Sequence, residues 1–370
     1  MALYPFLRAA YLDALADTGA VGAAAGWHDL SLGDRSPDEP SPGAPVAGWM
    51  PLYAKDNPWG EYVFDHQWAH AYQRHGLAYY PKLVTAVPYT PVPGPRWQLP
   101  AGQDAAAWLW PQIQTQLQHT GASGWHMLFP DQPTREALTG LPLISRQACH
   151  FRWFNRGYAD FDGFLDALVS RKRKGLRRER RRISEQHLRT ERACGSAIPE
   201  SWWDAFYACY ASTYLKRGQA PYLSQQFFRL LARDMPEQLM MSVAFDERDP
   251  ATAGTGVPVA AALYLFDERR LYGRYWGAVR DYDALHFELC YYQGIEFSIE
   301  RGLDEFDPGV QGEHKLLRGF EPVITWSLHH LVDPRFHDAI DDFCRREAAA
   351  VAAYREDALT LLPFREGPAD

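Results

Sequence analysis

The chain has 370 residues, of which 46% are hydrophobic and 23% are charged, and its formal net charge is −8. This length predicts about two globular domains with a core each. Five cysteines, an odd number without close pairs, exclude a disulfide framework and a zinc ribbon and indicate a reduced, cytoplasmic protein.

No apolar run approaches the roughly 20 residues that a membrane helix requires. The N-terminus has Asp13 and Asp17 where a signal peptide would stay apolar. We therefore expect no integral membrane association, and any membrane contact would be peripheral.

The first half of the chain predicts alternating helices and strands. A helical pattern over 6–16 precedes a loop rich in Gly, Pro and Asp at 33–43. The predicted elements that follow are strands at 45–53 and 82–89, an amphipathic helix at 104–119, a strand at 124–129, a helix near Arg135 and a strand at 148–154.

The second half predicts a similar series, which suggests that the two halves are structural repeats. Its predicted elements are helices at 202–214 and 224–233, strands at 240–245, 258–266 and 270–279, one helix at 285–301, a short strand from residue 305 and a final strand at 323–331. Helices around mixed strands define an α/β fold with mixed sheets.

A strongly basic run, RKRKGLRRERRR, occupies residues 171–182. It contains nine of the 38 Lys and Arg residues and one of the 46 Asp and Glu residues, so the rest of the chain has 29 basic and 45 acidic residues, a net charge of −16. Apolar residues at helical spacing predict a helix through the run. Since like charges at i,i+4 repel, the run favours an anionic partner, either the phosphates of a coenzyme, a lipid-linked or nucleotide-linked pyrophosphate, or RNA. The alternative is a solvated helix face.

Long motifs resemble the FemAB-like predicted N-acyltransferases, which are related to the FemABX peptidoglycan aminoacyltransferases and, more distantly, to GNAT acetyltransferases. The resemblance covers nearly the whole chain. The motifs are KDNPWGEYVFDHQWAHAYQRHGLAYYPKL, FDGFLDALVSRKRKGLRRERR, LYGRYWGAVRDYDALHFELCYYQGIE and GVQGEHKLLRGFEP.

The resemblance implies two tandem GNAT-like domains and transfer of an acyl group to an amine. We expect an N-terminal domain at 1–157, a basic connecting helix at 158–188 and a C-terminal domain at 189–370. The acyl donor and the acceptor are not implied.

The sequence departs from GNAT enzymes at the loop that typically binds the coenzyme A pyrophosphate. That loop has the pattern Q/R-x-x-G-x-G/A, whereas this chain reads RDYDALHF, with Arg280 as the leading basic residue and Asp283 and Leu285 in place of both glycines. Either the pyrophosphate binds elsewhere or the donor is not acyl-CoA.

The basic helix supplies the candidate donor-binding residues together with Arg280. They are Lys174, Arg177, Arg178 and Arg181. We expect acyl-CoA as the donor, because a net charge of −8 disfavours a large polyanion. Aminoacyl-tRNA, the donor of the related FemABX enzymes, is the alternative.

A second group of polar residues comes from the helix at 285–301 and from the segment GEHKLLRGF. Amine acylation needs a base and hydrogen-bond donors for the oxyanion. We interpret Glu313, His314 and Glu288 as catalytic residues. His286, Gln311, Lys315 and Arg318 are the candidate substrate-binding residues, the last two being placed to hold a carboxylate or phosphate.

This group also has other interpretations. It is consistent with a buried network of ion pairs that joins helix to loop. His286, Glu288, Glu313 and His314 are also a conceivable divalent-metal set, but the resemblance does not support a metal, and we expect none.

In the first half, Tyr79 and Lys82 are candidate substrate-binding residues, as part of an aromatic wall for the acceptor. Phe64, Trp68, Ala71 and Tyr72 have helical spacing, and we interpret them as core. His66 and His70 share a helix face without a third ligand, so we interpret them as surface residues.

Two classes of function remain. The first is an N-acyltransferase that acts on an amine of a small molecule or a cell-envelope precursor, which includes the peptidoglycan type that uses tRNA. The second is a non-catalytic module that recognises an anionic glycan precursor or RNA. The dense group of acids and bases favours the enzyme.

Overall fold

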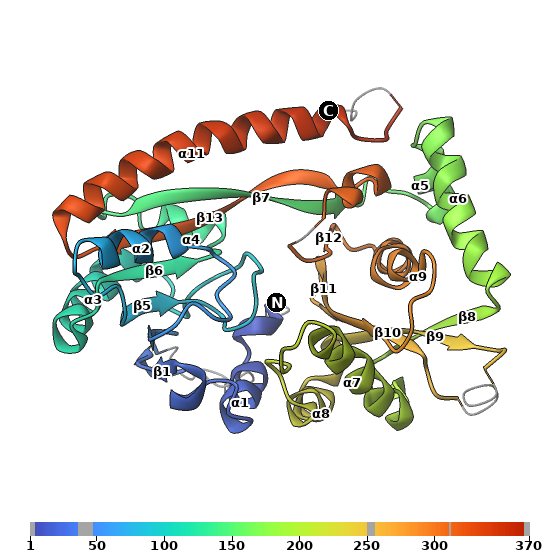
Figure 1. The fold of residues 1–370 in the computed structure, drawn as a ribbon, viewed down its shortest axis with the longest axis horizontal. Coiled ribbons are helices and arrows are strands. Elements are labelled where there is room, and N and C mark those ends of the chain that lie inside the picture. Colours follow the sequence, from blue (N-terminus) through green and yellow to red (C-terminus); the bar gives the residue numbers. More distant parts are fainter. Residues whose placement is uncertain (1–3, 36–46, 250–255, 311, 366–370) are drawn as a thin grey trace. The chain divides into compact units, whose positions relative to one another are not determined.

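The structure is a computed structural model that describes residues 4–35, 47–249, 256–310 and 312–365. The chain divides into two compact units. Unit 1 holds the described residues of 1–5, 150–323 and 355–370, and unit 2 holds those of 6–149 and 324–354. The divisions fall inside four elements, the 3-10 helix η1 (Pro5–Leu7), β7 (Ile144–Phe154), β13 (Glu321–Leu331) and α11 (Pro334–Thr360) (Figure 1). The predicted domain boundaries stay a prediction.

Unit 2 has a mixed sheet in the order β1-β4-β5-β6-β13. Neighbouring strands are antiparallel except β5 and β6, which are parallel, with Leu83 opposite Trp125. The further elements of this unit are α1 (Ala9–Asp17), β1 (Trp27–Asp29), β2 (Leu32–Gly33), β3 (Trp49–Met50), β4 (Tyr53–Lys55), α2 (His66–Arg74), β5 (Lys82–Thr85), α3 (Ala105–Thr120), β6 (Gly124–Leu128) and α4 (Gln132–Glu136).

Helix α3 shows how the sequence builds this unit. The Asp104 side chain accepts a hydrogen bond from the N–H of Ala107 and caps the N-terminus. Leu109, Ile113 and Leu117 recur every four residues and are buried in the core cluster with Trp125 and Leu83 of the sheet. The helix ends at Gly121, which takes the left-handed conformation.

Unit 1 has a mixed sheet in the order β7-β12-β11-β10-β9-β8. The pairs are antiparallel except β11 and β12. The further elements are α5 (Phe161–Asp166), α6 (Ser170–Glu185), β8 (Leu188–Cys194), α7 (Glu200–Leu215), α8 (Gln225–Asp234), β9 (Leu239–Asp246), β10 (Ala260–Phe266), β11 (Arg270–Ala278), α9 (Leu285–Phe287), α10 (Gln293–Arg301) and β12 (Glu305–Asp307).

Strands β9 and β10 are buried on both faces, which explains their continuous apolar sequences. Helix α7 packs closely on β11, because a Cβ at Gly277 would overlap the carbonyl of Cys209. Both units therefore combine a mixed sheet with helices, and this confirms the predicted α/β class.

The helix predicted at 285–301 is not continuous. It consists of α9, a π-helical turn over Glu288–Tyr292 and α10. The carbonyl oxygen of Leu289 accepts hydrogen bonds from the Ser242 hydroxyl at 3.0 Å and from the Tyr264 hydroxyl. These two strand side chains bind a carbonyl that a regular helix would use internally, and π turns of this kind occur frequently at functional sites.

The predicted basic helix is α6, and Leu176 and Ile183 are its buried residues. In α2, Trp68 and Tyr72 are buried as predicted, and His66 and His70 are exposed as predicted. Phe64 is exposed, which corrects its interpretation as core, because it precedes the first turn of α2. The predicted loop at 33–43 falls largely outside the described residues.

Candidate functional site

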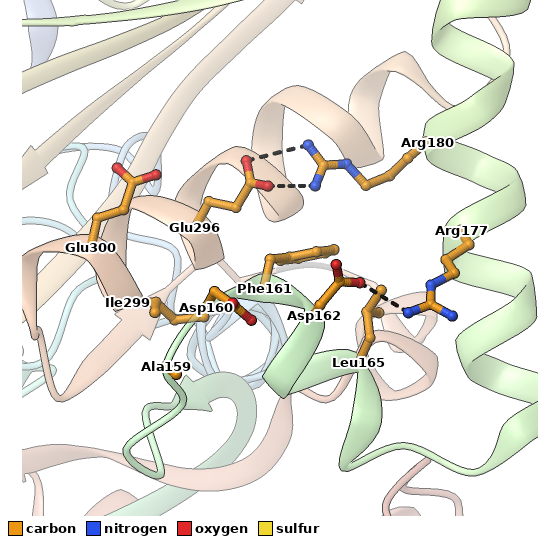
Figure 2. Close-up of a pocket in the computed structure, with 10 residues that line it drawn as sticks. All are labelled: Ala159, Asp160, Phe161, Asp162, Leu165, Arg177, Arg180, Glu296, Ile299 and Glu300. Carbon is orange, nitrogen blue, oxygen red and sulfur yellow. Dashed lines mark hydrogen bonds and ion pairs between the residues drawn. The ribbon is translucent and has the colours of Figure 1, made fainter.

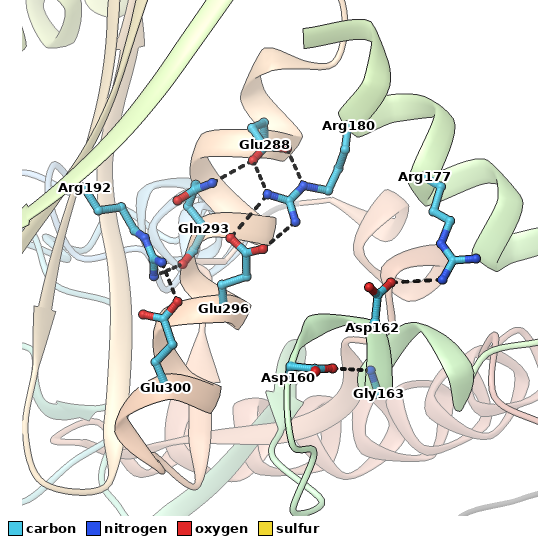
Figure 3. Close-up of polar contacts among 10 residues, drawn as sticks. All are labelled: Asp160, Asp162, Gly163, Arg177, Arg180, Arg192, Glu288, Gln293, Glu296 and Glu300. Carbon is cyan, nitrogen blue, oxygen red and sulfur yellow. Dashed lines mark hydrogen bonds and ion pairs between the residues drawn. The ribbon is translucent and has the colours of Figure 1, made fainter. Parts of the chain in front are cut away.

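Helix α6 contacts the rest of unit 1 through Arg180 (Figure 3) and through Glu179. The Arg180 guanidinium donates to both carboxylate oxygens of Glu288, at 3.1 and 2.9 Å, and also binds Glu296 of α10. It lies 4.6 Å from the ring centre of Phe161. One arginine of the basic run is thus tied to the helix that contains the π turn.

Glu288 is buried, and Gln293 also donates to it, at 2.7 Å. Both of its carboxylate oxygens therefore have partners in this structure. These contacts favour an anchoring role for Glu288, in which it orients Arg180, over the catalytic role expected from the sequence.

Arg318 is buried at the end of the 3-10 helix η6 (Glu313–Arg318). It donates to both oxygens of Glu179, at 2.8 and 3.2 Å, and to the carbonyl of His314 at 2.7 Å. The hydroxyl of Tyr292 donates to Glu179 as well. Glu179, the single acid of the basic run, thus joins α6 to the π turn and to η6.

Lys315 is buried, and its ammonium forms no ion pair with any residue that the structure describes. Its Nζ donates to the carbonyl of Gly309 at 2.6 Å. Burial lowers the pKa of Lys315 to about 8, although the negative charge of Asp307 acts to raise it. A buried cationic donor without a counter-ion is suited to stabilise negative charge that develops during a reaction.

His314 is half-buried beside Lys315, and its Nε2 lies 2.8 Å from the hydroxyl of Tyr291. Burial lowers the pKa of His314, and the charges of Arg318 and Lys315 lower it further. The ring centre of His286 is 6.1 Å from that of His314, and burial lowers the pKa of His286 to about 4. Both imidazoles are neutral at pH 7, as a proton acceptor must be.

Gly312 positions the His314 ring. It has a φ of +109°, and a Cβ at this glycine would overlap the imidazole of His314. Glu313 is exposed at the start of η6. Gln311, a predicted substrate-binding residue, lies outside the described residues.

A pocket of about 520 Å³ lies between α5, α6 and α10 (Figure 2). Four carboxylates and two arginines contribute to its wall, and Arg177 binds Asp162 while Arg180 binds Glu296. Phe161 and Leu165 supply apolar surface. All four carboxylates have partners, because Glu300 binds Arg192 at 2.6 Å and Asp160 accepts a hydrogen bond from the N–H of Gly163 at 2.7 Å (Figure 3). The acids are Asp160, Asp162, Glu296 and Glu300.

The predicted donor-binding residues are not gathered in one place. Arg280 is exposed and pairs with Asp249, while Arg181 pairs with Glu185 within α6. Lys174 and Arg178 are exposed on α6 and have no ion pair with a described residue. At the loop compared with the coenzyme A site, Asp283 binds Arg182 and Ala284 has a φ of 62°.

Tyr79 and Lys82 lie in unit 2 and are both buried there. Lys82 donates to Glu61 at 2.7 Å and also binds Asp65, which accepts a hydrogen bond from the Tyr79 hydroxyl at 2.6 Å. Burial raises the pKa of Glu61 to about 7. One oxygen of Glu61, one of Asp65 and Nε2 of His126 are buried without a hydrogen-bond partner among the residues that the structure describes.

Several residues of these clusters escaped the sequence reasoning. Glu61 and Asp65 stand at i,i+4 within the motif GEYVFD. This spacing is the sequence signal from which their proximity could have been predicted. Glu179 is the only acid among nine basic residues, which marks it as a partner. Tyr291 and Tyr292 have no such signal, since 20 tyrosines are spread over the chain.

Two negative findings concern the described residues alone. Among them, no group of three or more His, Cys, Asp or Glu is arranged to hold a metal ion. No helix of this part of the chain has both the length and the apolar run to cross a bilayer.

The fold is that of an α/β protein with mixed sheets. A family model, FemAB-like, described as peptidoglycan biosynthesis/recognition, matches residues 2–366, and the chain belongs to this family. No curated protein matches the chain.

Several solved structures are similar to this chain at low sequence identity. The crystal structure of FemX has a TM-score of 0.50 at 10% identity, over 90% of this chain and 93% of that one. L-PGS from Bacillus licheniformis has a TM-score of 0.48 at 10% identity, over 90% and 95% of the two chains. A tandem GNAT protein from the clavulanic acid biosynthesis pathway has a TM-score of 0.40 at 9% identity, over 87% and 94%.

Proposed function

We propose that this protein is a transferase that moves an acyl or aminoacyl group onto an amine of a peptidoglycan precursor, in the cytoplasm, where both classes of donor are made. The observation that supports this best is the buried ammonium of Lys315, which forms no ion pair with a described residue, beside the neutral imidazole of His314. The family description supplies the link to peptidoglycan.

The chemistry assigns a role to each group. The acceptor nitrogen attacks the carbonyl carbon of the donor, and the oxygen becomes an oxyanion that accepts a hydrogen bond from Lys315. His314 takes the proton from the attacking nitrogen, and Tyr291 orients its ring. The leaving thiolate or alkoxide then takes a proton as the new amide bond forms.

The pocket supports an amine-bearing acceptor, because its four carboxylates outnumber the three arginines that line it or pair with them, Arg177, Arg180 and Arg192. The donor is an activated acyl group, either the thioester acyl-CoA or the ester aminoacyl-tRNA. The segment 280–285 has no glycine, and Asp283 is bound to Arg182 there. This segment is therefore a poor pyrophosphate site, and both donor classes are tested.

The test is a transfer assay with the full chain and an amine-bearing peptidoglycan stem peptide. Acetyl-CoA and a mixture of aminoacyl-tRNAs are supplied in separate reactions, and mass spectrometry follows the peptide. We expect an N-acylated peptide with one donor class and its loss in Lys315→Met. Absence of product with both donors from folded protein would exclude the proposed activity for this acceptor class.

Replacing the two candidate bases separates their roles. His314→Gln should lower kcat strongly with little change in KM, while Glu313→Gln, at an exposed position, should change the rate less. The opposite order would return the base to Glu313, as the sequence first indicated.

A further inference from the structure

Helix α6 has an exposed face on which basic side chains form a stripe. Arg171, Lys174 and Arg178 follow one another at i, i+3 and i+7, the spacing of one helix face. All three are exposed, and their side chains form no ion pair or hydrogen bond with any residue that the structure describes. In Figure 1, α6 lies at the rim of unit 1.

More basic residues flank this stripe. Arg177, Arg181 and Arg182 are 53%, 66% and 44% exposed, and each pairs with an acid that is itself mostly exposed. Exposed pairs of this kind contribute little to stability, so these arginines exchange partners readily. Six basic residues are thus available to an anionic surface along one short helix.

The stripe lies on the opposite side of α6 from the cluster described above. At 100° per residue, Arg180 points about 150° and Glu179 about 110° away from the centre of the stripe. The phosphates of a small donor held at Lys315 would not reach Arg171, Lys174 and Arg178. The stripe therefore needs a partner of its own.

Exposed apolar side chains stand beside the first turn of α6. Val169, the residue before the helix, is 38% exposed, and its N–H donates to the carbonyl of Pro363 at 2.8 Å. Leu361, two residues before Pro363, is 58% exposed. Basic side chains next to exposed aliphatic ones are the combination that binds a lipid headgroup layer, because the aliphatic groups enter the acyl boundary.

We propose that this face of α6 binds the surface of an anionic lipid membrane. Four to eight clustered Lys or Arg residues on a helix are typical of such contacts. RNA is the less suitable partner, since it offers nothing to Val169 and Leu361, and the rest of the chain, with a net charge of −16, repels a long polyanion beyond the stripe. The inference does not depend on transferase activity.

The test is co-sedimentation of the full chain with vesicles. Neutral vesicles of phosphatidylcholine are compared with vesicles that contain 30% phosphatidylglycerol, at about 0.1 M and 0.5 M salt. We expect binding to the anionic vesicles at low salt, weaker binding at high salt and none to neutral vesicles. Failure to bind anionic vesicles at low salt would overturn the proposal.

The variant Arg171→Gln/Lys174→Gln/Arg178→Gln should bind these vesicles about 100-fold more weakly, since each basic residue at a membrane contributes about a factor of five. The matched control is Arg335→Gln/Arg345→Gln/Arg346→Gln, which removes the same charge from exposed positions of α11. An equal loss in both variants would show a net-charge effect and overturn the assignment.

Two further measurements identify the partner. Leu361→Ser should weaken vesicle binding at both salt concentrations, because it removes an apolar contact that salt does not screen. Bulk tRNA is titrated in parallel. One result would make the surface an RNA site and the membrane proposal wrong. In that result tRNA binds the wild-type chain and binds the stripe variant more weakly, while the vesicles bind neither chain.

Discussion

The carboxylate of Glu179 accepts two hydrogen bonds from the guanidinium of Arg318, at 2.8 and 3.2 Å. The two residues are 139 positions apart and connect the basic helix α6 to η6, where His314 and Lys315 lie. The ion pair thus fixes the backbone of the proposed catalytic segment from outside it. This explains why one acid is placed within an otherwise basic run.

Glu179→Gln should destabilise the protein by about 2 kcal/mol, because Arg318 is left buried with a weaker partner. Urea denaturation measures the loss. The control is Glu185→Gln, whose carboxylate pairs with Arg181 at an exposed site of the same helix and should cost less than about 0.5 kcal/mol. Equal effects in the two variants would contradict the anchoring role.

Gly312→Ala should displace the His314 ring while the fold persists. The added methyl group would overlap the imidazole, and a φ of +109° is unfavourable for alanine. We expect at least a tenfold loss of kcat/KM in the transfer assay. Gly302→Ala is the control, since Gly302 also has positive φ but no atom within 4 Å of an added Cβ. It should lower stability by about 1 kcal/mol and leave the rate unchanged.

Helix periodicity predicted much of the fold from the sequence. The helices at 104–119 and 202–214 appear as α3 and α7, because buried residues recur every three or four positions. The π turn inside 285–301 was not predictable in this way. It depends on Ser242 and Tyr264, which lie on strands 25 or more residues away in sequence and bind the carbonyl of Leu289.

The candidate site was predicted in part. The segment GEHKLLRGF was singled out for its density of charge, and the structure places His314, Lys315 and Arg318 in η6 with His286 nearby. Which charges are paired was not readable from the sequence. Glu288 pairs with Arg180 of α6 and Arg318 pairs with Glu179 of α6, whereas Lys315 forms no ion pair with a described residue. These pairings depend on the tertiary structure, which the sequence alone does not give.

Glu61→Gln should change the pH dependence of stability in unit 2. Burial raises the pKa of Glu61 from 4.5 to about 7, so between these values the folded chain binds a proton that the unfolded chain has lost. The contribution of Glu61 to stability therefore falls as the pH rises from 4.5 to 7, by up to about 1.4 kcal/mol per pH unit.

The measurement is urea denaturation of wild type and Glu61→Gln between pH 4.5 and 8. The stability of the wild type relative to the variant should decrease as the pH rises through this range. Glu136→Gln, at an exposed site of α4 where the carboxylate accepts from the uncharged Gln132, is the control and should show no such trend above pH 5. A constant difference between wild type and Glu61→Gln would show that Glu61 is ionised throughout.

Lys315→Met should abolish transfer and raise stability at pH 7. Burial lowers the pKa of Lys315 from 10.5 to about 8, so at pH 7 the folded chain holds a charged ammonium in a poorly solvated place. Methionine fills a similar volume without the charge, and we expect a gain of roughly 1–3 kcal/mol. A variant that is more stable and inactive indicates a residue retained for chemistry.

The sign of the pH dependence gives a second readout for the same variant. Between pH 8 and 10.5 the folded wild type loses the Lys315 proton while the unfolded chain keeps it, so the stability of the wild type rises relative to Lys315→Met. The advantage of the variant should therefore shrink from pH 8 to pH 10, as measured by urea denaturation. If Lys315→Met is instead less stable at pH 7, the ammonium is favourably solvated in the native state, and its proposed role as a donor kept ready for the oxyanion is wrong.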